Sequence, residues 1–100
     1  MSYIGPIGIQ IPFNPLGANI AVGTSAASLS AISSTNGFNL KADHQNTGNI
    51  FLGVDPTTLS TANAYYRLNP GESVFVCVKD LSRLAAVANA SNCKLYVIGG

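Results

Sequence analysis

The stretch that decides the fold covers residues 65–88 and reads YYRLNPGESVFVCVKDLSRLAAVA. It holds an Asn-Pro-Gly turn signal at 69–71, whose proline and glycine fit the two central positions of a type II β-turn. A dense apolar run follows at 73–79, and a shorter apolar run follows at 84–88. Short runs of this kind between turn signals predict strands. We therefore expect a hairpin at the Asn-Pro-Gly turn, a further turn at 80–83 and then another strand. The alternative for the segment that starts at residue 80 is a short helix capped by Asp80, with Leu81, Leu84 and Ala85 on one face.

The rest of the chain repeats this pattern of short apolar runs between turn residues. Alternation of apolar and polar residues predicts further strands at 19–23, 25–33, 38–45, 50–54, 64–68 and 93–100. Turn signals at intervals of about eight to twelve residues are typical of an all-β sandwich or barrel. We expect a single-domain β-sandwich or barrel of about seven short antiparallel strands at residues 19–100, preceded by an extended N-terminal arm at 1–18.

Side-chain parity along the last strands predicts part of the core. The residues expected to share one core are Val74, Val76, Leu95 and Val97. Cys93 has the parity of the inward residues, whereas Cys77 has the opposite parity. The two thiols are expected to point to different faces, so no disulfide is expected. The run at 73–79 is apolar on both faces, which raises the question of what covers its second face.

The predicted arm combines one apolar face with three prolines. The apolar face carries Ile7, Ile9, Ile11 and Phe13, and the prolines are Pro6, Pro12 and Pro15. Proline removes a hydrogen-bond donor from a strand, so this segment is not expected to be a central strand. It suits an edge strand or a strap on a neighbouring surface, and a strap across the chain's own core is the alternative. We favour the neighbouring surface.

Charge is scarce in this sequence. Charged residues make up 9% of the chain, the net charge is +1, and the first charged side chain is Lys41, whereas about 25% charged residues is usual. We interpret the surface as one covered largely by other protein, and a polar surface of Ser, Thr and Asn is the alternative. No basic cluster marks a nucleic-acid partner, and no apolar run of about 20 residues predicts a membrane span. The N-terminal residues lack a secretory pattern, so we expect synthesis in the cytoplasm.

No group of residues predicts catalysis, a metal site or a cofactor. His44 stands beside Asp43, but neighbours in a strand point to opposite faces. The acidic residues are scattered, and no nucleophile or nucleotide-binding motif is present. We therefore expect no enzyme activity and no cofactor. The charged turn KDLSR at 79–83 is either a solvated turn or a polar anchor, in which Arg83 reaches a carboxylate on a partner.

The order of features resembles small structural proteins of tailed bacteriophages. The shared features, over about residues 19–98, are NIAVGTSAASLSAIS, then GFNLKADHQNTGNIFLGVD, then YRLNPGESVFVCVKDLSRLAAVANASNCKLYVIGG. Several such proteins look like capsid decoration, or cement, proteins. The resemblance implies a virion structural protein that binds between capsomers on the capsid exterior, with the major capsid protein and itself, as a homotrimer, for partners.

A decoration protein works by burying surface, so its expected site is a protein interface. The expected interface residues are Ile7, Ile9, Ile11, Phe13, Phe75, Cys77 and Arg83. Two alternatives stay open. One is a head-fibre or tail-associated module for attachment, in which the loop at 55–63 would bind saccharide or protein, although this loop has no aromatic residue. The other is a β-sandwich adaptor unrelated to viruses.

Overall fold

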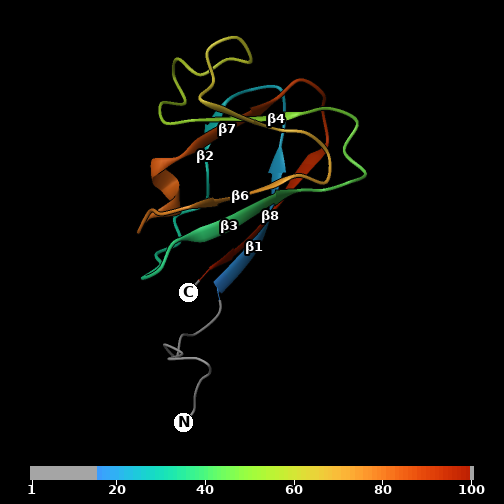
Figure 1. The fold of residues 1–100 in the computed structure, drawn as a ribbon. Helices are drawn as coiled ribbons and strands as arrows, with labels where there is room; N and C mark the ends of the chain where they lie inside the picture. The colour runs from blue at the N-terminus through green and yellow to red at the C-terminus, as the bar shows by residue number, and fades with distance from the viewer. Residues whose placement is uncertain (1–15, 100) are drawn as a thin grey trace.

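Two four-stranded antiparallel sheets make up the computed structural model, which describes residues 16–99 (Figure 1). Sheet A has the order β1-β8-β3-β6, and sheet B has the order β2-β7-β4-β5. The strands are β1 Leu16–Val22, β2 Ala27–Ser28, β3 Phe38–Ala42, β4 Ile50–Gly53, β5 Tyr66–Leu68, β6 Ser73–Val76, β7 Ala85–Ala88 and β8 Cys93–Gly99, and a 3-10 helix spans Leu81–Arg83. The expected all-β sandwich is confirmed, with eight strands in the described part of the chain.

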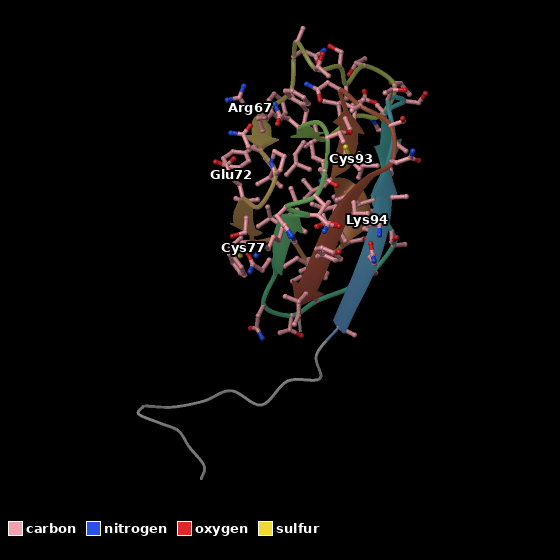
Figure 2. All side chains as sticks on the ribbon, turned by 90° about the vertical axis from the view of Figure 1, so that its right-hand side faces the viewer. Arg67, Glu72, Cys77, Cys93 and Lys94 are labelled. Atoms are coloured by element: carbon pink, nitrogen blue, oxygen red, sulfur yellow. The ribbon has the colours of Figure 1, made fainter. Side chains whose placement is uncertain are left out.

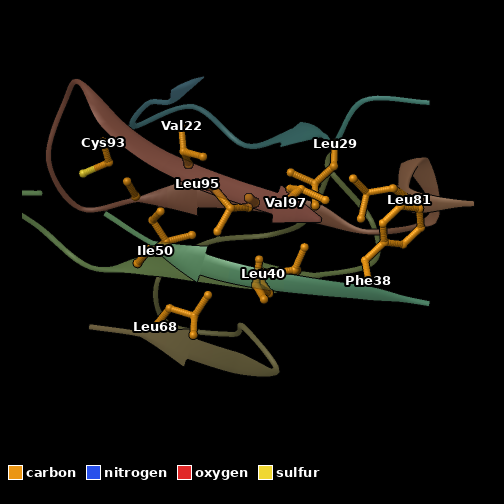
Figure 3. Close-up of a cluster of buried hydrophobic side chains, with 14 residues drawn as sticks. Val22, Leu29, Phe38, Leu40, Ile50, Leu68, Leu81, Cys93, Leu95 and Val97 are labelled. Atoms are coloured by element: carbon orange, nitrogen blue, oxygen red, sulfur yellow. The ribbon is translucent and has the colours of Figure 1, made fainter. Parts of the chain in front are cut away.

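The core lies between the two sheets because both present apolar side chains inward. In β3 and β8, burial alternates strictly along the strand, as expected for a sheet with one face on the core. The largest fully buried side chains are Phe38, Leu40, Ile50, Leu68, Leu81, Leu95 and Cys93 (Figure 3). Burying each large aliphatic or aromatic side chain stabilises the fold by about 1.5–3 kcal/mol. The predicted core residues are confirmed: Leu95 and Val97 are buried, and Val74 and Val76 pack against the same cluster.

The Asn-Pro-Gly turn forms as expected, but it does not close a hairpin. The backbone N–H of Glu72 donates to the carbonyl oxygen of Asn69 at 2.9 Å, and Gly71 has a φ of 85°, as a type II turn requires. However, among the described strands β5 pairs only with β4, and β6 pairs only with β3. The turn therefore carries the chain from sheet B to sheet A, and the expected hairpin is wrong. Turn chemistry sets the local backbone direction, whereas burial of Leu68 and Val74 in one core selects the pairing.

Strand boundaries differ from the expected ones at several places. Strand β1 begins at Leu16, three residues before the expected start of the sandwich, because its residues pair with β8 from Leu16 onwards. The expected strand at 25–33 is reduced to Ala27–Ser28. The expected strand at 73–79 ends at Val76, and the expected turn at 80–83 is a 3-10 helix that Asp80 caps by accepting from the N–H of Ser82 at 3.0 Å.

Two glycines with positive φ provide a matched test of the fold. Gly71 (φ 85°) has room for a methyl group, since an added Cβ would meet only the His44 Cβ at 3.7 Å. Gly37 (φ 99°) has no such room, since an added Cβ would lie 2.6 Å from the Val76 carbonyl oxygen. We expect Gly71→Ala to lower the free energy of unfolding by about 1–2 kcal/mol through backbone strain alone. Gly37→Ala should lower the free energy of unfolding by at least about 1 kcal/mol more than Gly71→Ala does, because the added methyl group also has no room.

Urea unfolding of the two variants measures this difference. Equal losses of stability would contradict the close contact between Gly37 and β6.

Candidate interaction surfaces

The outer face of sheet A, meaning the side of that sheet turned away from sheet B, carries large apolar side chains. Strand register places Ile98 and Phe75 on either side of Asn39. Phe75 is 59% exposed, Ile98 is 58% exposed and Tyr96, further along β8, is 41% exposed. These side chains point outward because alternate residues of the same strands fill the core. The core is thus complete without them, and they are available for contact with other protein.

Phe75 and Cys77, two of the expected interface residues, border the same small residue. A Cβ built on Gly37 would lie 2.8 Å from the Phe75 Cζ and 3.2 Å from the Cys77 Cα. The Phe75 ring therefore rests against Gly37, which lies on the turn that leads into β3. Both thiols are free, and Cys77 is exposed whereas Cys93 is buried (Figure 2). The structure thus brings Phe75 and Cys77 together at one edge of sheet A.

The other expected interface residues lie elsewhere. Arg83 is exposed at the last position of the 3-10 helix. Its charge helps to lower the pKa of Asp80, although hydrogen bonds from Ser82 are the larger cause. The arm residues Ile7, Ile9, Ile11 and Phe13 lie outside the described residues. Their expected role as interface residues stays a prediction.

An apolar cleft opens at the edge of the sandwich where β5 and β6, the end strands of the two sheets, come together. This edge cleft has a volume of about 180 Å³ and is lined by Leu52, Gly53, Val54, Tyr65, Tyr66, Val74, Val76 and Leu84. Arg67, Glu72 and Cys77 mark the same side of the molecule in Figure 2. Val54 and the two tyrosines are among the exposed large apolar residues. The sequence did not predict this cleft, because the cleft exists only where β5 and β6 are the outermost strands of their sheets.

A second cavity lies under the loop that follows β4, which crosses the top of the view in Figure 1. It has a volume of about 290 Å³ and is lined by Gly53, Val54, Asp55, Thr58, Leu59, Asn63 and Tyr65. The loop is held by its own side chains. Asp55 accepts from the hydroxyl of Thr57 at 2.7 Å, and the Asn63 amide donates to the Thr58 carbonyl at 2.8 Å. The loop itself has no aromatic residue, but Tyr65 follows it and is 78% exposed beside this cavity.

A polar cluster surrounds Asp43 at the end of β3. The Tyr96 hydroxyl donates to Asp43 Oδ2 at 3.2 Å, and His44 Nδ1 lies 3.4 Å from Oδ1. The pKa of Asp43 is lowered, mainly because the backbone N–H of Gln45 donates to its carboxylate, and also by Tyr96 and by the charges of His44 and Lys94. Partial burial acts in the opposite direction. The cluster therefore favours an ionised carboxylate that holds the end of β3 against β8.

The described residues show no arrangement of titratable groups that suits a metal ion. Within residues 16–99, no three His, Cys, Asp or Glu side chains come close enough to hold one. In the same range, no helix is long and apolar enough to cross a membrane.

Comparisons of the chain with family models, with curated proteins and with solved structures each returned no match.

The Asp43 cluster predicts how stability depends on pH. The folded-state pKa of Asp43 lies below its ordinary value of 3.8, so the ionised carboxylate stabilises the fold above that value. This contribution is lost as the pH falls through the folded-state pKa. We expect Asp43→Asn to lower the urea midpoint at neutral pH, with the loss shrinking below a pH of about 4.

Tyr96→Phe is the matched control, because it removes one donor to Asp43 and keeps the ring. It should reproduce part of the same pH-dependent loss. A loss of equal size at neutral and acid pH would show that Asp43 does not stabilise the fold through its charge.

Proposed function

We propose that this chain is a structural protein of a bacteriophage virion that decorates the capsid exterior and stabilises the shell by binding between capsomers. The observation that carries this proposal is the outer face of sheet A, where Phe75, Tyr96 and Ile98 stand exposed on a sandwich whose core is complete without them. A cement protein performs its function by burying such surface. The resemblance of residues 19–98 to phage structural proteins supports the same function.

The physical basis of this function is contact area repeated by symmetry. A stable protein interface buries about 1,200–2,000 Å² in total, and aromatic side chains contribute most strongly near its centre. A sheet face that presents Phe75, Tyr96 and Ile98 beside Asn39 and Lys41 fits a contact of this kind. Arg83, on the 3-10 helix, would pair with a carboxylate of the partner. Each contact can be modest, because many copies bind one shell and each shell protein is held at several points.

A second candidate function is favoured by one specific observation. In a head-fibre or tail module, the loop at 55–63 would bind a saccharide or a protein of the host. Tyr65 is exposed next to the loop cavity, and an exposed ring beside polar side chains can stack on an apolar ligand face while the polar groups orient the ligand. The outer face of sheet A has no role in this alternative, so substitutions there distinguish the two functions.

Charge introduced on the outer face of sheet A tests the decoration function. We expect Phe75→Lys and Ile98→Lys to change the free energy of unfolding by less than about 1 kcal/mol, because both side chains are largely exposed. Both should weaken binding to phage capsids that lack the native protein by about tenfold or more, because a buried unpaired charge is costly. Co-sedimentation with capsids measures the binding.

Thr61→Lys, which adds the same charge to the exposed loop after β4, is the matched control and should bind as the native chain does. If capsid binding survives both outer-face variants and is lost with Thr61→Lys, the capsid interface lies on the loop and not on the outer face of sheet A.

The oligomeric state is a separate prediction of this function. We expect the isolated chain to form a homotrimer, because decoration of threefold sites places three copies together and the surface is poor in charge. Sedimentation velocity at micromolar concentration should give the mass of three chains. A stable, soluble monomer at that concentration would count against self-association.

A further inference from the structure

The edge cleft lies where each sheet ends without a neighbouring strand. In the described part of the chain, β6 ends sheet A and β5 ends sheet B, so each has backbone groups along one edge that are not paired within its sheet. The inward side chains Val74 and Val76 are only half-buried, whereas the inward side chains of the neighbouring strand β3 are fully buried. This side of the sandwich therefore presents both apolar side chains and unpaired backbone to an incoming strand.

The N-terminal arm has the pattern of a strand that pairs along one edge only. In an extended chain, the N–H and C=O groups of alternate residues point to the same edge. The odd positions from Ile7 to Phe13 hold no proline, so their backbone groups can all pair with one neighbour. Pro6 and Pro12 fall at even positions and remove donors from the opposite edge only. Such a segment can be added to the end of a sheet and closes that sheet to further strands.

The size and polarity of the edge cleft suit the side chains of the arm. A dry apolar cavity of about 150 Å³ holds a benzene molecule, and the edge cleft measures about 180 Å³. The Phe13 ring is therefore of the right size to enter it. No charged residue lines the cleft, and no charged residue precedes Lys41 in the sequence. Contact between the two segments thus buries no unpaired charge.

Residue 13 is too close in sequence to β1 to form part of a strand along β6 of its own copy. Strand register places Leu16, Phe38 and Val76 at one level of sheet A, with β8 also lying between β1 and β6. A strand added outside β6 lies four inter-strand spacings from Leu16, or about 19 Å. Three extended residues cover at most about 11 Å. An added strand that includes residue 13 must therefore come from another copy.

We propose that the arm of one copy docks in the edge cleft of a second copy, with the Phe13 ring in the cleft and residues 7–13 paired along β6 as an added strand. Strand addition of this kind combines backbone hydrogen bonds with pockets for alternate side chains. Arm and cleft are different surfaces, so the contact is head-to-tail, and a rotation of 120° between copies would close it into the ring that a homotrimer requires. The inference rests on the proposed function in one respect, namely that copies of the chain associate with one another. It adds the surface to which the arm binds.

Photo-crosslinking of the full chain tests the inference directly. Phe13 is replaced by p-benzoylphenylalanine, and chains labelled with ¹⁵N are mixed with unlabelled chains so that mass spectrometry separates crosslinks between copies from crosslinks within one copy. We expect crosslinks between copies to residues of the edge cleft, such as Tyr66, Val74 and Leu84. The same photoreactive residue at Gln10, whose side chain has the opposite parity, should give at least about tenfold less crosslinking to these residues.

A charge on the rim of the cleft gives an independent readout. Val54 is exposed, so Val54→Lys should leave the fold intact and raise the dissociation constant for self-association by about tenfold or more. Ile98→Lys, on the outer face of sheet A, should leave self-association unchanged even where it weakens capsid binding. Crosslinks within one copy, crosslinks to another surface, or a chain that stays monomeric would overturn the inference. Capsid binding that persists in such a chain would leave the proposed function standing.

Discussion

The position of β8 in the middle of sheet A is the constraint on which the rest of the structure depends. This strand pairs with β1 on one side and with β3 on the other, and its inward residues Cys93, Leu95 and Val97 are all buried. Once those three side chains face the core, the two-residue period of a strand turns Tyr96 and Ile98 to the outside. A slip of one residue would expose the core and bury the outer face. The same contacts that stabilise the sandwich therefore determine the surface that it offers to a partner.

The parts of the fold that depend on local pattern were predictable from the sequence, and the parts that depend on pairing were not. Alternation placed Leu95 and Val97 in the core, and the type II turn at 69–71 followed from its proline and glycine. The sheet that each strand joins is set by long-range burial, so the same turn was wrongly expected to close a hairpin. For the site, the outward parity of Phe75 was readable from the sequence. The edge cleft and the place of Tyr65 beside it were not, because they arise where the ends of two sheets meet.

The two apolar surfaces differ in what they can recognise. The outer face of sheet A offers side chains across the broad side of four paired strands, so it suits a partner with a complementary broad surface. The edge cleft offers a pocket beside unpaired strand edges, so it suits an extended segment. A chain with both can bind a large structure through one and its own copies through the other. If the chain binds in both of these proposed ways, binding at one surface would raise the effective concentration at the second, and attachment and self-assembly would strengthen each other.

The central place of β8 also determines when this polypeptide can fold. Strands β1 and β3 both need β8 as a neighbour, yet β8 leaves the ribosome after the other seven strands. Until then, sheet A has no centre, and the inward faces of its other strands have no stable cover. Folds that rely on pairing between distant segments form slowly and expose apolar surface to aggregation meanwhile. Folding of sheet A must therefore follow synthesis of β8. A nascent chain that stalls before residue 93 cannot form a complete sheet A.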